Sequence, residues 1–235
     1  KIRPYVGAGI NYTLFYSEKP SAALETAVGA TKVKMKSSFG WAAQAGIDFA
    51  NSEYQLWHAN LAGREALRSG IAPPDSGHPQ FNRHSDDIDY QIESDFAGLI
   101  SPGLPGQAIR LGETFGRLMN YGDGLYGGQF VAALYALAFT ETDMTKLVTA
   151  ALAYIPAESQ YAQAIRDVLT WHQQDPKDWK KTWQKIQDKY HANPQYRQFS
   201  CDKHRFNIDA KINGAYVVLG LLYGNRDPEK TIQIA

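Results

Sequence analysis

The stretch "LYGGQFVAALYALAF" (Leu125–Phe139) decides the fold predicted for most of this 235-residue chain. Its apolar side chains lie nearly all the way round a helix, which is typical of a helix that is buried on every side. The stretch is shorter than the roughly 18 apolar residues that a membrane span needs, and it contains glycines. It therefore predicts the buried central helix of a helical domain.

Helical periodicity continues on both sides of this stretch and begins near Ser52. Asp175 and Pro176 are typical of a helix start, as are Asp227 and Pro228, and Gly224 is typical of a helix end. Residues 52–235 are therefore predicted to form one mainly α domain. Beside the central helix and a helix near residue 90, the helices are expected at about 105–120, 143–155, 158–173, 176–191, 208–223 and from 228 onward.

The first fifty residues have a different period. In "RPYVGAGINYTLFY" and "KVKMKSSFGWAAQAGIDF" apolar side chains alternate with small or charged ones, which predicts two strands of an antiparallel β-hairpin. Lipid-facing strands of a membrane barrel and strands of a soluble sandwich both have this alternation. No linker composition separates the two patterns, so we expect a join near Asn51, between units 1–51 and 52–235.

Composition excludes several classes of protein. Lysine plus arginine and aspartate plus glutamate number 24 each, so the charge does not favour nucleic acid as a partner. A single cysteine, Cys201, excludes an internal disulfide framework and a cysteine-rich zinc site. His78 and His84 lack the helical spacing or the cysteine partners of the common zinc sites.

The acidic stretch "HSDDIDYQIESDF" (His84–Phe96) is predicted to begin a helix at Ser85 or Asp86. Ile88, Ile92, Phe96 and Leu99 would form one buried apolar stripe along this helix. Asp89 and Asp95 would border the stripe, where an acid costs free energy unless it is paired or bound, so both are candidates for a site. Asp86 and Asp87 would lie near the helix start, as capping residues or as functional ones, with Asp87 on the wet side.

The stretch "GDGLYG" (Gly122–Gly127) matches the spacing of the dinucleotide-binding fingerprint, but no strand precedes it. A tight turn between two buried helices explains its glycines better than a dinucleotide site does. Asn120 and Asp123 are then expected to be exposed in that turn, as polar groups that face a ligand.

Residues 1–50 resemble an internal piece of the OmpW family of outer-membrane barrels, in "KIRPYVGAGINYTLFY" and "SSFGWAAQAGIDFA". The resemblance implies strands of an eight-stranded barrel with a hydrophobic interior route. It implies an outer-membrane location for the parent of this part, and a membrane partner only if the segment belongs to a full barrel. Transport of small hydrophobic molecules by such a fragment is the alternative function.

The remaining residues resemble the ADP-ribosylglycohydrolase family, in "SGHPQFNRHSDDIDYQIESDFAGLISPGLP", "MNYGDGLYGGQFVAALYALAF", "IPAESQYAQAIRDV" and "FNIDAKINGAYVVLGLLYG". The resemblance implies a cytoplasmic, all-helical hydrolase in which two Mg²⁺ ions activate water to cleave a glycosidic bond to ADP-ribose. The early metal motif of the family resembles Ser85-Asp86-Asp87 only superficially, because the residues around these three match the middle segment of the family's sequence. The late Asp-x-Asp motif is expected just beyond Ala235.

The resulting expectation is a chimaeric chain: a barrel-type β-hairpin followed by a truncated, all-helical ADP-ribosylglycohydrolase-like domain. ADP-ribose or an ADP-ribosylated substrate is the expected partner. Mg²⁺ is the cofactor of the parent family but is not expected on this chain, so little or no catalysis is expected. The alternatives are a membrane or transport protein and a helical scaffold without catalysis. The expected substrate-binding residues are Asp89, Asp95, Asn120 and Asp123, with Asp86 and Asp87 as a partial metal-ligand set.

Overall fold

The computed structural model describes residues 3–13, 38–48, 58–193 and 208–235. The chain divides into two compact units, Lys1–Gln55 and Leu56–Ala235. The expected join near Asn51 and the loop around Cys201 lie outside the described residues. Among the described residues, no helix combines the length and the apolar character of a membrane span.

Two strands are described in the first unit, β1 (Arg3–Thr13) and β2 (Ser38–Asp48). Their backbones pair antiparallel, from Arg3 opposite Asp48 to Thr13 opposite Ser38. The alternation of apolar side chains predicted for residues 14–16 and 32–36 falls outside the described residues. That the segment is a hairpin of a membrane barrel stays a prediction.

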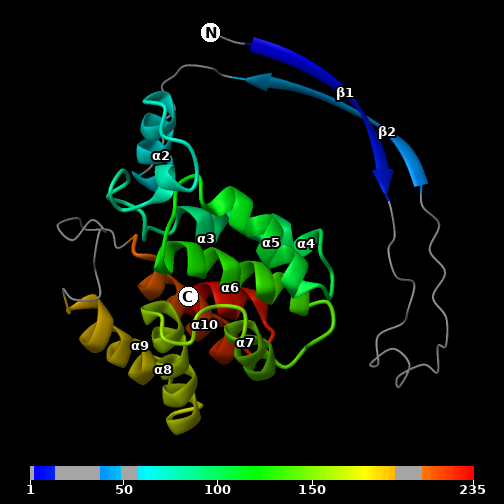
Figure 1. The fold of residues 1–235 in the computed structure, drawn as a ribbon. Helices are drawn as coiled ribbons and strands as arrows, with labels where there is room; N and C mark the ends of the chain where they lie inside the picture. Colours follow the sequence, from blue (N-terminus) through cyan, green and yellow to red (C-terminus); the bar gives the residue numbers. More distant parts are fainter. Residues whose placement is uncertain (1–2, 14–37, 49–57, 194–207) are drawn as a thin grey trace. The chain divides into compact units, whose positions relative to one another are not determined.

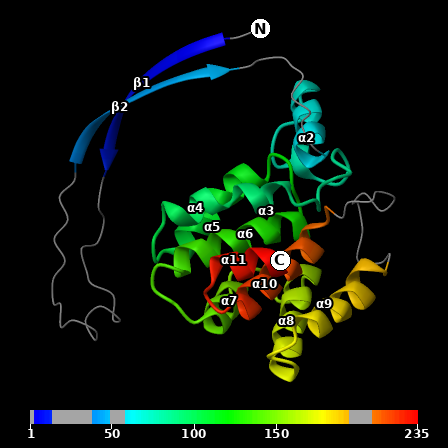
Figure 2. The ribbon, with the colours of Figure 1, turned by 180° about the vertical axis from the view of Figure 1, so that it is seen from behind.

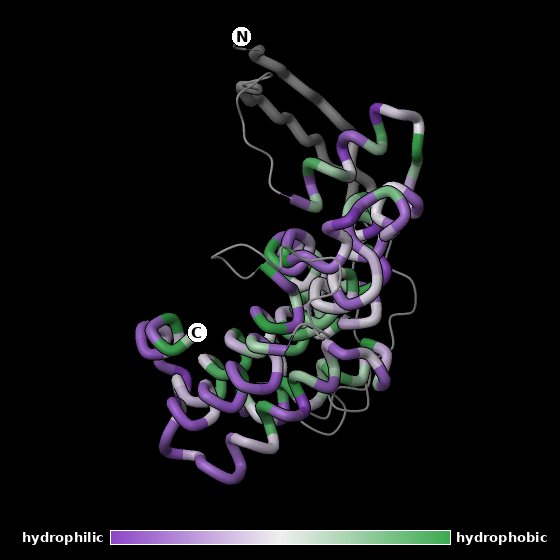
Figure 3. Tube along the Cα trace, turned by 90° about the vertical axis from the view of Figure 1, so that its left-hand side faces the viewer, coloured by the Kyte–Doolittle hydropathy of each residue, from purple (hydrophilic) through white to green (hydrophobic). Residues whose placement is uncertain are grey.

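The second unit is mainly α-helical, as the periodicity predicts (Figures 1 and 2). Hydrophobic and hydrophilic residues alternate along most of its helices (Figure 3), because each of these helices has one buried face. Its α-helices are α2 (His58–Arg68), α3 (Asp89–Glu93), α4 (Asp95–Leu99), α5 (Pro105–Gly116), α6 (Asp123–Leu137), α7 (Met144–Leu152), α8 (Gln160–Gln174), α9 (Trp179–Ile186), α10 (Ala210–Gly224) and α11 (Pro228–Ile234). A 3-10 turn, η1 (Asp75–Gly77), and a π-helical turn, η2 (Gln187–His191), complete the unit.

Helix α6 is the buried central helix that its apolar sequence predicts, and this prediction is confirmed. It packs against α3, α4 and α5 and against α7, α8 and α10 (Figure 1). Gly128 on α6 is in direct contact with the buried ring of Tyr90, since a Cβ atom there would lie 2.1 Å from Tyr90 Cδ1. Gly214 on α10 is likewise in direct contact with the buried ring of Tyr161, which a Cβ atom at this position would overlap.

The sequence also predicts several helix ends correctly. Asp227 caps α11 by accepting a hydrogen bond from the Lys230 backbone N–H at 3.1 Å, and Pro228 is the first helical residue. The predicted start at Asp175 is wrong, since α9 begins at Trp179 with Asp178 as its N-cap. Asp175 instead forms ion pairs with Lys181 and Lys185, at 3.2 and 3.4 Å.

Candidate functional site

The acidic stretch near residue 90 forms two short helices, α3 and α4, where one longer helix was predicted. The predicted apolar stripe is wrong, because Ile92 is 64% and Leu99 48% exposed. The buried face carries polar and small residues instead, at a helical spacing: Asp87, Tyr90, Gln91, Ser94, Ala97 and Gly98. Asp87, expected on the wet side, has no exposed surface.

Asn120 explains how this polar face can be buried. Its side-chain amide donates to the Ser85 and Asp87 carbonyl oxygens, at 2.9 and 2.8 Å, and its carbonyl oxygen accepts from the Tyr90 N–H at 3.0 Å. Because an amide carries both donors and an acceptor, it can satisfy backbone groups that no regular helix pairs. The prediction that Asn120 is exposed is wrong, since it is fully buried and positions residues 85–90.

A short backbone pairing brings the chain near residue 209 against this segment. Ile88 N–H donates to the Ile208 carbonyl oxygen at 2.8 Å, and Ala210 N–H donates to the Asp86 carbonyl oxygen at 3.0 Å. Asp209 also caps α10 by accepting from the N–H groups of Lys211 and Ile212. These contacts place the first turn of α10 beside Asp86.

Asp86, Asp209 and Lys211 form a buried charged cluster, which we call the charged centre. Lys211 Nζ lies 2.7 Å from Asp209 Oδ2 and 3.5 Å from Asp86 Oδ2. The Lys211 side chain is only 1% exposed, so each charge requires the others for compensation. Sequence reasoning missed Asp209 and Lys211, although Lys211 is the one charged residue in the otherwise uncharged helix α10.

Burial changes the proton affinities of these groups. Desolvation raises the pKa of Asp86 to about 7, although Lys211 opposes the shift. Desolvation also raises the pKa of Asp123. Burial alone would lower the pKa of Lys211, but the carboxylates of Asp209, Asp86 and Asp123 raise it, so Lys211 stays protonated.

A cavity of about 270 Å³ opens beside the charged centre. Asp123, the first residue of α6, lines it and accepts a hydrogen bond from the Tyr161 backbone N–H at 2.9 Å. The structure thus brings Asp86 and Asp123 to one cavity, which we call the acidic pocket. Its lining residues are Pro79, Ser85, Asp86, Tyr121, Gly122, Asp123, Gln160 and Lys211.

The other two predicted site residues lie elsewhere. Asp89 accepts hydrogen bonds from the backbone and side-chain nitrogens of Asn60, at 3.1 and 3.0 Å, and lines a separate cavity with Ile92. Asp95 accepts from the N–H of the next residue, Phe96, at 2.7 Å. Asp89, Asp95 and Asp123 therefore do not converge on one cavity.

The residues of the charged centre do not suit a two-magnesium site. Mg²⁺ prefers carboxylates and water arranged octahedrally, and here an ammonium group already lies against both carboxylates. A divalent ion at this position would meet the charge of Lys211. Asp87, the other acid of the predicted partial metal-ligand set, contacts the imidazole rings of His58 and His84 instead.

His58, His84 and Asp87 offer ligand-type atoms within 4.8 Å of one another. Each histidine Nδ1 lies near Asp87 Oδ2, at 3.5 Å for His58 and 3.0 Å for His84, and the two rings are stacked. Arg83 Nε donates to His84 Nε2 at 3.2 Å, which leaves the ring proton of a neutral His84 on Nδ1, where it can be donated to Asp87. Hydrogen bonding therefore accounts for the contact between His84 and Asp87 without a metal.

The fold and the site define a mainly helical domain that contains a buried carboxylate–lysine cluster beside a cavity. Comparison with known proteins bears on the other end of the chain. Residues 1–64 match the OmpW family. Over 73 residues the chain is 34% identical to the outer membrane protein W of Vibrio cholerae serotype O1. The aligned segment covers 29% of this chain. It spans about a third of the length of that relative, 33%. No solved structure matches the chain.

Proposed function

We propose that the helical unit is an incomplete ADP-ribosylglycohydrolase-like domain that binds ADP-ribose or a related ribosyl ligand and cleaves glycosidic bonds little or not at all. Four stretches of sequence that resemble that family, and a mainly helical unit, support the proposal. The observation that carries it is the meeting of Asp86, Asp123 and Lys211 at one cavity.

The acidic pocket has the chemistry to hold a ribose. Carboxylates are strong acceptors for the paired hydroxyl groups of a sugar, and the Lys211 ammonium adds a donor. At about 270 Å³ the pocket is slightly smaller than the ~300–1,000 Å³ typical of small-molecule sites, so we expect it to hold the ribose end of the ligand.

Any chemistry in this pocket rests on Asp86. A pKa of about 7 lets a carboxyl group release and take up a proton near neutral pH, which general acid–base catalysis requires. Divalent metal would supply activated water in the parent family. Because the charged centre does not suit Mg²⁺, we expect ligand binding that does not depend on magnesium, and slow or absent turnover.

Isothermal titration calorimetry of the full 235-residue chain with ADP-ribose tests this proposal, with and without Mg²⁺. We expect heat of binding in both conditions. Asp123→Asn should weaken binding at least about tenfold, because a hydrogen bond to a charged group contributes about 1.5–3 kcal/mol. The matched control is Asp188→Asn, which changes an exposed acid on η2 and should leave binding unchanged. Absence of heat, or equal affinity in both variants, would refute the proposal.

A second function is favoured by the family match at residues 1–64. We propose that this segment derives from an OmpW-like outer-membrane barrel, with the location and the transport of small hydrophobic molecules that the resemblance implies. Fractionation of bacteria that produce the full chain tests it. The second function predicts the chain in the outer-membrane fraction, whereas recovery in the cytoplasmic fraction alone would contradict it and agree with the helical unit as the functional part.

A further inference from the structure

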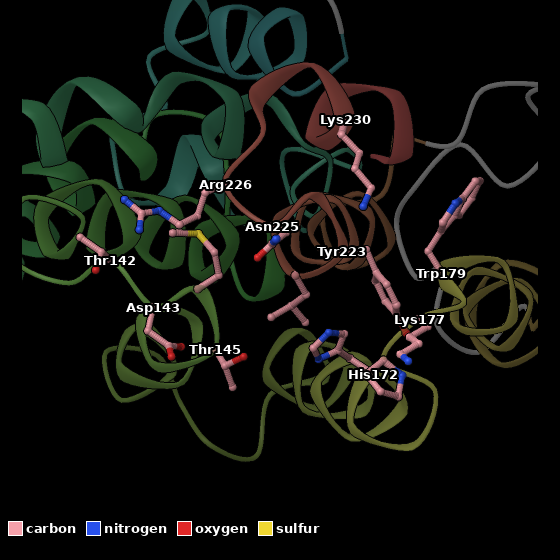
Figure 4. Close-up of a pocket in the computed structure, with 13 residues that line it drawn as sticks. Thr142, Asp143, Thr145, His172, Lys177, Trp179, Tyr223, Asn225, Arg226 and Lys230 are labelled. Carbon is pink, nitrogen blue, oxygen red and sulfur yellow. The ribbon is translucent and has the colours of Figure 1, made fainter.

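A separate cavity of about 750 Å³ lies on the helical unit where α7, α8, α10 and α11 meet the start of α9 (Figure 4). It shares no lining residue with the acidic pocket. Its volume is within the ~300–1,000 Å³ range of small-molecule sites. Its lining residues are Thr142, Asp143, Met144, Thr145, His172, Pro176, Lys177, Trp179, Leu222, Tyr223, Asn225, Arg226 and Lys230.

The charges that line this cavity are mostly positive. Lys177, Arg226 and Lys230 approach it from different sides, and they come from the loop before α9, the loop after α10 and helix α11 (Figure 4). Within the described part of the chain, none of the three side chains forms an ion pair. The one acid in the lining, Asp143, accepts a hydrogen bond from the Lys146 N–H as the N-cap of α7. The cavity should therefore have a positive potential.

The backbone that presents Arg226 has an unusual conformation. Asn225 and Arg226 both have positive φ angles, 53° and 67°. Asparagine adopts this left-handed region readily at the end of a helix, but arginine does so at a cost in free energy. Such conformations are concentrated at functional sites, where the surrounding structure holds them in place. Here the conformation places a guanidinium group at the edge of the cavity.

Aromatic and apolar side chains form the wall between these cations. Tyr223 is held from two directions, because its hydroxyl donates to the Asp175 carbonyl oxygen at 2.7 Å and contacts the Thr182 hydroxyl at 2.8 Å. The His172 ring meets the Tyr223 ring edge-to-face, with centroids 4.7 Å apart. Leu222 is buried next to them. This wall is fixed before any ligand arrives, which lowers the cost of ordering on binding.

From these features we propose that the cavity binds a small organic phosphate, with its phosphate group between Arg226 and Lys230 and its apolar part against Tyr223. A planar guanidinium matches phosphate oxygens in a bidentate geometry, and a nearby lysine adds a point charge. Three cations exceed what a single carboxylate needs, which favours the doubly charged phosphate. The inference is independent of the proposed function, because it concerns other residues.

Calorimetry of the full chain with adenosine monophosphate, adenosine and inorganic phosphate tests the inference. Adenosine monophosphate should bind, and adenosine, which lacks the phosphate, should bind at least about tenfold more weakly. The double variant Arg226→Gln/Lys230→Gln should weaken binding of adenosine monophosphate by at least about tenfold. The control Lys146→Gln/Lys180→Gln removes two exposed lysines and the same net charge outside the cavity, and should change the affinity less than about twofold.

Other outcomes would overturn the inference. The inference is wrong if adenosine monophosphate gives no heat of binding, or if the two double variants bind adenosine monophosphate with equal affinity. It is also wrong if adenosine binds as tightly as adenosine monophosphate. Loss of binding in Asp123→Asn but not in Arg226→Gln/Lys230→Gln would place the nucleotide in the acidic pocket. Binding to vesicles that contain phosphatidic acid, but to neither soluble phosphate, would assign the cations to a lipid headgroup and contradict a small-molecule site.

Discussion

Helix α6 and the segment of residues 84–99 are both buried in the helical unit, but by opposite means. Helix α6 buries apolar and small side chains, and its glycines admit neighbouring rings. Residues 84–99 bury carboxylates, an amide and two serines, and they leave Ile92 and Leu99 exposed. The first region is stabilised by the hydrophobic effect, which has no direction, whereas the second depends on specific partners such as Asn120 and Lys211.

This difference predicts which substitutions are most damaging. Lys211→Met should have the largest effect, because it leaves Asp86 and Asp209 buried together without a cation. Breaking a buried ion pair costs about 3–5 kcal/mol in free energy of unfolding. Urea denaturation of the full chain measures this loss. Lys146→Met, an exposed lysine on α7, should change stability by less than about 0.5 kcal/mol. Equal stability of the two variants would mean that Lys211 is solvated.

Asn120→Leu should be the next most damaging substitution. It keeps a side chain of similar size but removes three hydrogen bonds to the backbone of residues 85–90. The Ser85 carbonyl oxygen still accepts from the Tyr121 N–H, whereas the Asp87 carbonyl oxygen and the Tyr90 N–H lose the Asn120 amide as their partner. At about 1 kcal/mol for each lost hydrogen bond, we expect a loss of about 3 kcal/mol. The same denaturation measurement checks it, and a loss below about 1 kcal/mol would show that water replaces the amide.

Gly128→Ala tests the apolar region in the same way. The added Cβ atom would lie 2.1 Å from Tyr90 Cδ1, so the ring must move within a close-packed interior. Overpacking of this kind costs about 1–3 kcal/mol. Gly106→Ala on α5 is the control, because the nearest atom to its Cβ would be an Arg110 guanidinium nitrogen 3.9 Å away. That variant should keep or increase the melting temperature, and a decrease similar to that of Gly128→Ala would contradict the packing around Tyr90.

Ile92→Asn should have the smallest effect. The sequence pattern places Ile92 on a buried stripe, whereas the structure leaves 64% of its surface exposed. Surface substitutions usually change stability by about 0.5 kcal/mol or less. A loss above 2 kcal/mol, about what full burial of an isoleucine contributes, would favour the stripe that the sequence predicts.

These contrasts explain how much the sequence could predict. Helix α6, helix α11 and the mainly α character follow from local patterns, namely apolar periodicity, an Asp cap and a proline at the first helical position. The orientation of residues 84–99 does not, because it depends on Asn120 and on residues 208–210, which are distant in sequence. A rule that places apolar residues inside therefore assigns the wrong face to this segment.

The candidate site divides in the same way. Asp123 and Asp86 could be named from the sequence, but their meeting at the acidic pocket depends on the hydrogen bonds that Asn120 and Tyr121 donate to the Ser85 carbonyl oxygen. Lys211 could have been noticed as a lone charge in an uncharged helix, yet only the fold shows which acids it contacts. Asp89 and Asp95, chosen for their position beside the predicted stripe, lie outside the acidic pocket because that stripe is not buried.

The most direct test of the buried charged centre is the titration of the Asp86 carboxyl group, followed by carbon NMR of the full chain. Asp86→Asn identifies the resonance. Burial beside Asp209 and Lys211 predicts a titration midpoint near pH 7. A midpoint near the ordinary value of 3.8 would show a solvated aspartate, and would contradict both the charged centre and the acidic pocket built on it.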